Sequence, residues 1–239
     1  MTVPLRLLID PPLDGPVNMA RDEALLDAAG AGECPATLRC YRWSEPTVSL
    51  GYFQPYAEFE SCSAVRQFSV VRRTTGGGAI LHERELTYCL AVPSRHPLLS
   101  GGATNLYCSM HDAIIAVVRG LGGQAARRGS VRPDDAGGDE PFLCFERAHA
   151  LDVVVGECKL AGSAQRRTPN AVLQHGSIVL DAIHPDSGVN PDGLARRIAR
   201  QFADDNGLSL TPSVWQPSEL DRANRHAVRY NSATWTRRR

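Results

Sequence analysis

The stretch Arg72-Arg73-Thr74-Thr75-Gly76-Gly77-Gly78-Ala79-Ile80-Leu81-His82 decides the fold. Its three consecutive glycines lie between two runs with the composition of strands, so a glycine-rich loop between strands is expected. Such a loop lets the backbone approach a ligand and offer N–H groups with no side chains in the way, although glycines alone also fit a plain hairpin. No lysine follows the glycines, as in a Walker A loop, and no helix follows directly, as in a dinucleotide-binding fingerprint. The motif predicts another kind of ligand-binding loop.

A second informative segment surrounds Lys159, which is the only lysine among 26 basic residues. The other 25 basic residues are arginines. An amine differs from a guanidinium because it is a compact point charge that can give up its proton when buried. Lys159 begins the segment Lys159-Leu160-Ala161-Gly162-Ser163-Ala164-Gln165, directly after the aliphatic run 151–155. This small and apolar setting favours a buried functional amine over a solvated surface charge.

A third segment, Leu173-Gln174-His175-Gly176-Ser177-Ile178-Val179-Leu180-Asp181, places a histidine and a glycine at the centre of a strand-like run. In this order the three segments resemble the lipoate/octanoate family of protein acyl-modifying enzymes, whose catalytic fold is shared with biotin protein ligases. The resemblance covers residues from about 5 to about 205. It departs from the family at Gly156-Glu157-Cys158, where a Gly-Arg pair often precedes the lysine.

The resemblance implies an α+β fold of the biotin/lipoate protein ligase type. In that fold a mixed, largely antiparallel sheet is flanked by helices, and the acyl chain lies in a tunnel beneath the glycine-rich loop. A length of 239 residues fits one catalytic domain over residues 1–239. Residues 129–141 are rich in Gly, Asp and Pro and are expected to form a loop. Periodicity predicts helices over 18–29, with Asn18 as N-cap, and over 104–120, 191–204 and 218–228, and strands over 3–9, 37–43, 47–52, 69–73, 79–82, 86–92, 151–155, 159–166 and 171–180.

Composition excludes several classes of function. A hydrophobic fraction of 43% and a charged fraction of 22% are typical of a soluble globular protein, and zero net charge argues against nucleic-acid binding through bulk charge. No apolar stretch reaches the ~20 residues of a membrane span, and residues 1–10 lack the pattern of a signal peptide. Seven cysteines without a Cys-x-x-Cys motif fit neither a disulfide framework nor a zinc site. We therefore expect a reduced, cytoplasmic protein with no membrane, nucleic-acid or metal partner. Four arginine pairs fit either solvated faces or an acidic partner: Arg72-Arg73, Arg127-Arg128, Arg166-Arg167 and Arg196-Arg197.

Two chemistries occur in the family that the chain resembles. Ligases activate free lipoate with ATP, whereas cysteine-dependent octanoyltransferases take octanoyl from acyl carrier protein and hold it on an enzyme cysteine. A thioester intermediate needs a thiolate nucleophile. Cys144, in Phe142-Leu143-Cys144-Phe145-Glu146, stands 15 residues before Lys159. This segment resembles the Cys-Phe segment of the octanoyltransferases, at the matching distance from the lysine.

The other cysteines offer weaker alternatives, because cysteine is often an ordinary core residue. Cys158 is next to Lys159 in a predicted strand, where successive side chains face opposite ways, so the two cannot share a pocket. Cys89 lies within a predicted strand and is expected in the core. The others are distant from the motifs in sequence: Cys34, Cys40, Cys62 and Cys108.

The resemblance implies two half-reactions. Cys144 takes octanoyl from octanoyl-acyl carrier protein, and a lysine of a lipoyl domain, such as that of the glycine cleavage H protein, then receives it as an amide. Lys159 is expected to position the acyl carbonyl, stabilise its oxyanion and favour the Cys144 thiolate. No metal or nucleotide cofactor is required. The residues expected to bind the acyl group are Arg73, Gly76, Gly77, Gly78, His82, Gly162, Ser163 and His175.

Three alternatives remain open at this point. An ATP-dependent lipoate-protein ligase is one, although the chain ends at Arg239 without room for the accessory domain that many ligases carry. An amidotransferase that moves octanoyl between lipoyl domains would use the same cysteine and lysine. A catalytically silent acyl-binding protein is disfavoured by the intact glycine-rich loop, Cys144 and Lys159.

Overall fold

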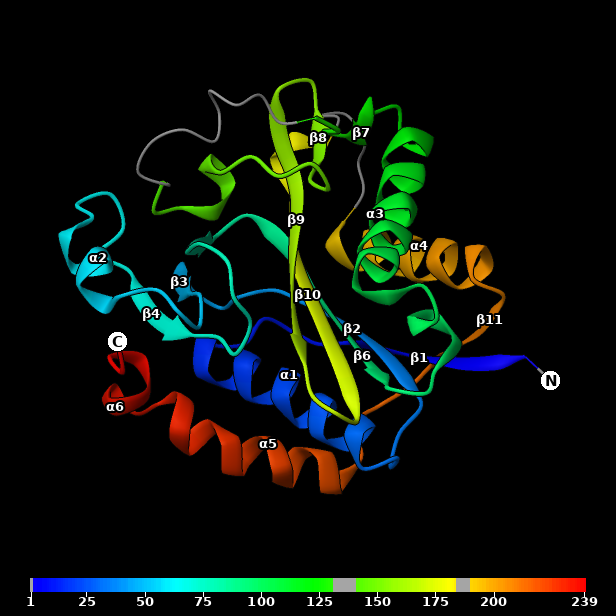
Figure 1. Cartoon of the computed structure of the whole chain (residues 1–239), viewed down its shortest axis with the longest axis horizontal. Coiled ribbons are helices and arrows are strands. Elements are labelled where there is room, and N and C mark those ends of the chain that lie inside the picture. The colour runs from blue at the N-terminus through cyan, green and yellow to red at the C-terminus, as the bar shows by residue number, and fades with distance from the viewer. Residues whose placement is uncertain (1, 131–140, 184–189) are drawn as a thin grey trace.

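A long central sheet organises the molecule (Figure 1). The computed structural model describes residues 2–130, 141–183 and 190–239. Strand β1 (Val3–Ile9) pairs in parallel with both β11 (Leu208–Pro212) and β2 (Ala36–Tyr41), and the other neighbours in this sheet pair antiparallel. The predicted mixed, largely antiparallel sheet is therefore confirmed. In spatial order its eight strands are β11 (Leu208–Pro212), β1 (Val3–Ile9), β2 (Ala36–Tyr41), β6 (Glu85–Pro93), β10 (Ala171–Val179), β9 (Cys158–Arg167), β8 (Val153–Val155) and β7 (Ala125–Arg127).

A second, three-stranded sheet carries the glycine-rich loop. Its order is β4 (Ser69–Arg72), β3 (Thr47–Leu50) and β5 (Ile80–His82), with β3 parallel to β4 and antiparallel to β5. Residues 73–79 connect β4 to β5. The predicted position of this loop between two strands is confirmed, and the small sheet holds both of its ends.

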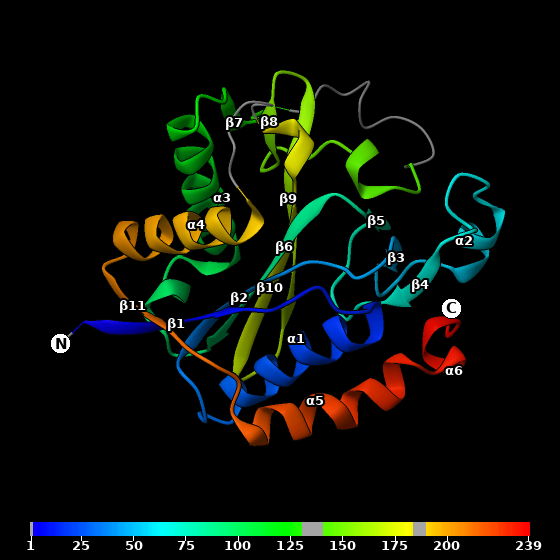
Figure 2. The same cartoon turned by 180° about the vertical axis from the view of Figure 1, so that it is seen from behind.

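Helices cover both faces of the long sheet (Figures 1 and 2). Helices α1 (Gly15–Gly30) and α5 (Pro217–Tyr230) lie on one face, and α3 (Gly102–Gly120) and α4 (Pro191–Asp205) lie on the other. Each face has its own apolar cluster, because alternate side chains of a strand point to opposite faces. In β2, Leu38 and Cys40 belong to the apolar cluster beneath α3 and α4, whereas Tyr41 belongs to the cluster beneath α1. No helix among the described residues is both long and apolar enough to cross a bilayer.

The start of the first helix differs from the prediction. The helix begins at Gly15, not at Asn18, because the Asp14 side chain accepts a hydrogen bond from Val17 N and Pro16 stands in the first turn. Asn18 is fully buried inside the helix, and its side-chain amide donates to the carbonyl oxygens of Leu13 and Arg42. The expected N-cap is therefore wrong. A proline in the first turn, preceded by Asp, is itself a start signal.

Among the described residues, four short α-helices and β-strands were not predicted. They are α2 (Tyr56–Ser61), β7, β11 and α6 (Ala233–Thr236). Their few residues give too short a window for hydrophobic periodicity, and they form because tertiary neighbours hold them. The remaining predicted helices and strands occur in the structure, with ends that shift by one or two residues. The loop expected over 129–141 falls mostly on residues 131–140, which lie outside the described residues.

Candidate active site

A pocket lies between the glycine-rich loop, the centres of β9 and β10 and the start of α1. Aromatic and aliphatic side chains such as Met19, Trp43 and Ile80 form much of its wall, as suits a hydrocarbon chain. It brings together seven of the ten residues predicted for the site: Arg73, Gly77, His82, Cys144, Gly162, Ser163 and His175.

Cys144 lines this pocket, and Lys159, which comes from a different segment and lines a neighbouring groove, reaches its sulfur. Residues 142–144 pair with the end of the glycine-rich loop, since Ala79 N donates to Phe142 O at 3.0 Å and Cys144 N donates to Ala79 O at 2.6 Å. The β8–β9 hairpin brings in the lysine. Its Nζ lies 3.8 Å from Cys144 Sγ and 3.1 Å from Cys144 O. The ammonium therefore lies next to the sulfur of the one described cysteine that lines the pocket.

Lys159 is held tightly in this orientation. Its Nζ lies 3.0 Å from Asp152 Oδ2, and the two side chains are only 4% and 6% exposed. The Phe145 ring lies under the ammonium, with its centroid 5.4 Å away. A side chain at Gly162 would place its Cβ 2.7 Å from Lys159 Cε. Gly162 is therefore required for the lysine side chain to lie along the strand, which refines its predicted acyl-binding role.

Arg73 organises the glycine-rich loop from within. It is buried, and its guanidinium donates to the carbonyl oxygens of Ser49, Gly76 and Gly78, each at 2.7 Å. Burial lowers the pKa of Arg73 to about 10, while the negative charge of a Cys144 thiolate acts in the opposite direction. Gly76 and Gly78 do not line the pocket; the structure gives them a part in fixing the loop instead.

The middle of the loop makes a close backbone contact. Gly77 has φ of +89°, a conformation that L-amino acids with side chains rarely adopt. A Cβ on Gly51 would lie 1.9 Å from Gly77 O. The loop after β3 and the glycine-rich loop can approach this closely only because both positions are glycine.

His82 lines the pocket through its ring. It stacks on Trp43, with centroids 3.9 Å apart and an interplanar angle of 13°. Its Nε2 lies 2.7 Å from Ser49 Oγ, and its Nδ1 contacts the Glu85 carboxylate. Burial raises the pKa of Glu85, but His82 and a hydrogen bond from Ser177 outweigh burial and hold this pKa below its usual value. The histidine thus forms part of a rigid, hydrogen-bonded wall.

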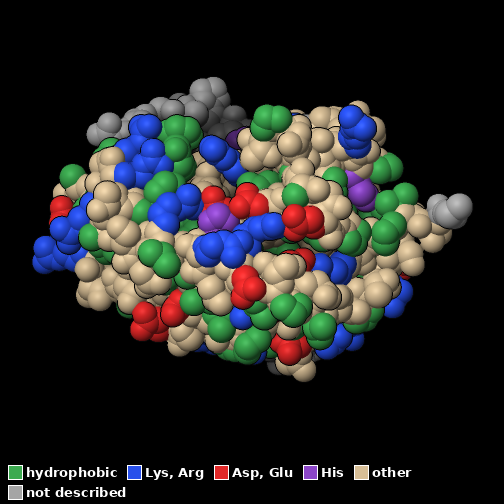
Figure 3. Space-filling model, turned by 90° about the horizontal axis from the view of Figure 1, so that it is seen from below, with side chains coloured by type: hydrophobic (Ala, Val, Ile, Leu, Met, Phe, Trp, Pro, Cys, Tyr) green, Lys and Arg blue, Asp and Glu red, His purple; other side chains and the backbone are tan. Residues whose placement is uncertain are grey.

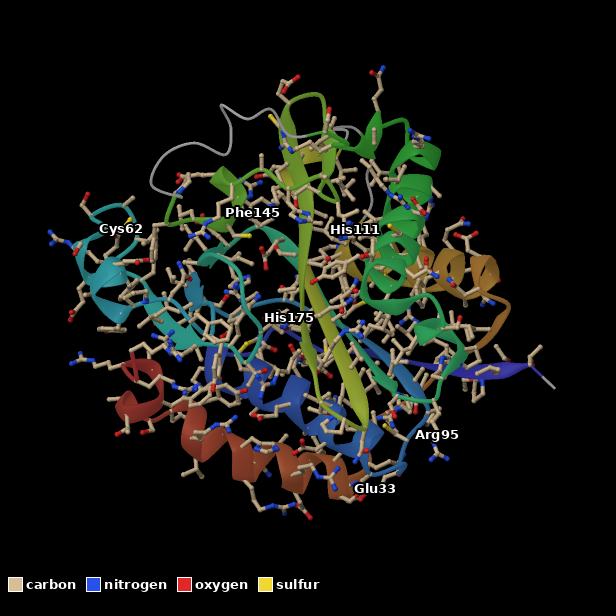
Figure 4. All side chains as sticks on the ribbon, in the orientation of Figure 1. Glu33, Cys62, Arg95, His111, Phe145 and His175 are labelled. Atoms are coloured by element: carbon tan, nitrogen blue, oxygen red, sulfur yellow. The ribbon has the colours of Figure 1, made fainter. Side chains whose placement is uncertain are left out.

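His175 occupies the floor of the pocket near the start of α1 (Figure 4). Its Nε2 lies 2.5 Å from Thr75 Oγ1 of the glycine-rich loop, and its Nδ1 lies 3.5 Å from Asp22 Oδ2. Burial lowers the pKa of His175, which favours the neutral ring. Asp22 is itself held by Arg39 at 2.6 Å and by the Tyr41 hydroxyl at 2.8 Å. This network ties the loop to the core.

Two further residues of the site were not predicted. Asp152, the partner of Lys159, is the one acidic residue in an aliphatic run, and that position was a usable signal. His111 of α3 points toward β9, where its Nε2 lies 2.6 Å from Ser163 Oγ and its Nδ1 donates to Leu151 O at 2.6 Å (Figure 4). Burial lowers the pKa of His111 to about 4. The Tyr88 hydroxyl lies 2.5 Å from the same Ser163 Oγ.

The other cysteines lie as predicted relative to the pocket. Cys158 is exposed and does not line the acyl pocket, although it lines the neighbouring groove together with Lys159. Cys89 is completely buried in the core. Burial raises the pKa of Cys89 well above its usual value, so it is a poor nucleophile. Among the described residues, no three His, Cys, Asp or Glu side chains are grouped to hold a metal ion.

Comparison with known families identifies the fold and its relatives. Residues 14–185 match the family described as the lipoyl protein ligase A/B catalytic domain. The chain belongs to this family. The matched range includes the glycine-rich loop, Cys144, Lys159 and His175, so the predicted family membership is confirmed.

Curated relatives in this family are octanoyltransferases. The chain is 38% identical over 217 residues to octanoyltransferase LipM of Kyrpidia tusciae, a match that covers 86% of this chain and 77% of the relative. It is 44% identical over 171 residues to octanoyltransferase LipM of Symbiobacterium thermophilum, covering 70% and 62% respectively. Matches to most of these relatives thus span under two thirds of their length. The predicted kinship with octanoyltransferases, and with acyltransferases as an enzyme class, is confirmed.

Solved structures confirm the fold. A lipoate-protein ligase A bound with ATP superposes with a TM-score of 0.78 at 21% identity, covering 99% of both chains. A bi-partite lipoate protein ligase from Thermoplasma acidophilum, described with its E2 lipoyl domain, gives a TM-score of 0.67 at 20% identity and covers 99% of this chain and 96% of that one. These similarities show a shared α+β architecture.

Proposed function

We propose that this chain is an octanoyltransferase that moves octanoyl from acyl carrier protein, through a thioester on Cys144, to the lysine of a lipoyl domain in lipoate biosynthesis. The observation that carries the proposal is the contact between Lys159 Nζ and Cys144 Sγ, 3.8 Å apart, at the edge of an apolar pocket. An activated cysteine beside a hydrocarbon-binding cavity is what acyl transfer through an enzyme thioester needs.

In the first half-reaction the Cys144 thiolate attacks the thioester carbonyl of the donor. The new carbon–sulfur bond forms, the bond to the carrier sulfur breaks, and the carrier leaves as a thiol after taking up one proton. Lys159 donates to the oxyanion that develops on the carbonyl oxygen. Because Asp152 and Phe145 fix the ammonium before substrate arrives, little reorganisation is needed at the moment of reaction.

In the second half-reaction a neutral lysine amine of the acceptor attacks the Cys144 thioester. The amide bond forms, Cys144 leaves as a thiolate stabilised by Lys159, and the amine nitrogen loses a proton. Lipoyl domains are the acceptor class that suits this family, and a domain such as glycine cleavage H protein is the acceptor we propose. The enzyme acts as a single catalytic domain in the cytoplasm.

Two alternatives use the same fold. A ligase would bind ATP and free lipoate in this pocket, and it would not require Cys144. An amidotransferase would keep the roles of Cys144 and Lys159 but take octanoyl from another lipoyl domain. The cysteine–lysine contact favours thioester chemistry over the ligase, and the donor separates the two thioester routes.

A donor comparison tests the proposal. Purified protein is incubated with an apo lipoyl domain and one of three donors: octanoyl-acyl carrier protein without ATP, free octanoate with ATP, or an octanoylated lipoyl domain. We expect modification from the carrier protein without ATP. Modification only from free acid with ATP would establish the ligase, and modification only from the octanoylated lipoyl domain would establish the amidotransferase.

A further inference from the structure

Seven side chains from three segments form a surface next to the glycine-rich loop, here called the arginine–aromatic surface. Guanidinium groups lie over aromatic rings throughout: the Arg238 Cζ is 4.2 Å from the Tyr52 centroid, and the Arg237 Cζ is 5.0 Å from the Tyr56 centroid. Such stacking holds an arginine in place while leaving its N–H groups free to bind. The members are Tyr52, Phe53, Tyr56, Arg166, Arg237, Arg238 and Arg239.

The positive charge of this surface is not neutralised by the chain itself. Within the described residues, none of its four arginines is ion-paired with a carboxylate. Two arginines of the neighbouring helix α5 behave differently, since Arg222 pairs with Glu33 at 2.9 Å and Arg229 pairs with Glu23. Figure 3 shows basic side chains gathered toward the side of the molecule where Figure 1 places α6, whereas both signs of charge mix over the centre of that face.

A fifth arginine, buried beneath the arginine–aromatic surface, adds to the positive potential of that surface. Arg72 is completely buried, and its Nη1 donates to Gly51 O at 2.8 Å and to Gln54 O at 2.7 Å, while its Nε donates to Thr236 O at 2.9 Å. Its Nη2 is buried without an acceptor among the described residues. Burial, reinforced by the charge of nearby Arg238, lowers the pKa of Arg72. The region therefore favours an incoming anion.

The surface adjoins the pocket directly. Tyr52 N donates to Thr75 O of the glycine-rich loop at 2.8 Å, and the preceding Gly51 lies against Gly77, a pocket residue. On the other flank, Arg166 follows Ala164 along β9, and Ala164 also lines the pocket. A protein bound here would sit beside the cavity that receives the acyl chain.

Exposed arginines and aromatic rings are the residue types that dominate protein–protein binding energy. A planar guanidinium with free donors matches a carboxylate in bidentate geometry. The groove on the far side of Cys144 is lined by both signs of charge, including Arg147, Glu146 and Glu157, so it offers no comparable preference for acidic groups. The chemistry of the arginine–aromatic surface therefore selects an acidic protein face.

We propose that the arginine–aromatic surface docks a carboxylate-rich face of the acyl-donor carrier protein; the inference rests on the function proposed above. The donor is favoured over the acceptor because an acceptor must bring a lysine amine, a cation in water, toward the site. Four unpaired arginines repel that cation, whereas the thioester of a donor is uncharged. Like-charge contacts of this kind lower affinity and slow association.

The test compares two octanoyl donors with one triple variant, Arg237→Glu/Arg238→Glu/Arg239→Glu. The matched control carries the same charge change on α4, Arg196→Glu/Arg197→Glu/Arg200→Glu, where all three side chains are exposed. Acylation of Cys144 is measured as kcat/KM with octanoyl-acyl carrier protein and with octanoyl-pantetheine, which has no protein surface. We expect the surface variant to lose at least about tenfold with the carrier protein and less than about twofold with octanoyl-pantetheine. The control should lose less than about twofold with either donor.

Wild-type protein provides a second readout that does not depend on a variant. Its kcat/KM with the carrier protein should fall with added KCl, while that with octanoyl-pantetheine stays nearly constant. Equal losses with both donors, an equal loss in the α4 control, or a loss confined to transfer onto the lipoyl domain would overturn the docking assignment. Tight binding of a fluorescent oligonucleotide that prevents the carrier protein from binding would also overturn the docking assignment. If octanoyl-pantetheine acylates Cys144 but the carrier protein never does, the proposed donor, and not only its docking surface, is wrong.

Discussion

Lys159 and Asp152 form an ion pair of 3.0 Å whose two side chains are almost completely buried beside the candidate nucleophile. The pair gives the only lysine of the chain a carboxylate partner in an apolar setting. Asp152 Oδ2 also accepts a hydrogen bond from His149 N at 2.9 Å, so the carboxylate is fixed before it fixes the lysine. The direction in which the ammonium points is thus set by the fold.

Replacing Asp152 with Asn should weaken both stability and catalysis. The variant leaves a buried ammonium without its counter-ion, and breaking a buried pair in this way costs about 3 kcal/mol. We expect urea denaturation to show a loss of that size and Cys144 acylation to slow at least about tenfold. The control is Asp181→Asn, which removes a surface pair with Arg84 and should cost less than about 0.5 kcal/mol. Similar losses in both variants would contradict a special role for Asp152.

Lys159→Arg keeps the charge but should not keep the activity. The lysine lies between Asp152, Phe145 and the Cα of Gly162, where a larger planar group cannot take the same position. A misplaced group at the reacting centre costs about a hundredfold. We expect a folded protein whose octanoyl transfer is slower by at least about two orders of magnitude. Retention of more than about a tenth of wild-type activity would mean that charge alone suffices.

The close contact between Gly51 and Gly77 predicts that alanine at Gly51 destabilises the protein far more than alanine at a glycine with free space around it. Gly51→Ala would place a Cβ 1.9 Å from Gly77 O, a backbone atom that cannot move freely, and should cost at least about 2 kcal/mol. Gly120→Ala at the end of α3 meets nothing within 4 Å and has no positive φ, so it should be neutral or slightly stabilising. Thermal denaturation of the two variants tests this, and equal melting temperatures would refute the close contact.

His111 predicts a pH dependence of stability. Its pKa is about 4 in the folded protein against 6.5 when unfolded, so the unfolded chain binds a proton that the folded protein refuses. Stability is therefore complete above pH 6.5 and falls as pH drops from there toward 4. At 1.36 kcal/mol per unit, lowering the pH to about 5 should cost about 2 kcal/mol. In His111→Gln, unfolding free energies at about pH 7.5 and pH 5 should differ by correspondingly less, and an unchanged difference would contradict the buried neutral histidine.

Much of the fold was accessible from the sequence because its signals are local or contiguous. The amphipathic pattern over 104–120 predicted α3, and the glycine triplet with its flanking strands predicted the loop between β4 and β5. Short elements such as β11 were missed because long-range pairing with β1 creates them, and that pairing leaves no periodic trace in five residues. Asp14, rather than Asn18, starts the first helix because a proline reinforces its cap.

The site residues could be predicted from the sequence where their residue type is chemically distinctive. Cys144 and Lys159 stand out by residue type and lie together as expected, and Cys158 does not line the acyl pocket. The contacts that make the site precise come from residues distant in sequence, such as the hydrogen bond between His111 and Ser163, 52 positions apart. Burial of a histidine on the packed face of a helix can be suspected from the pattern, but its partner on another element cannot be derived without the fold.

In the proposed mechanism Cys144 carries the octanoyl group. The most direct measurement is intact-mass analysis after incubation with octanoyl-acyl carrier protein in the absence of acceptor, followed by peptide mapping. We expect one octanoyl adduct per chain, located on Cys144, released by hydroxylamine and absent in Cys144→Ser, which should also lose turnover. An adduct on Cys158 or Cys89, or full transfer activity in Cys144→Ala, would contradict it.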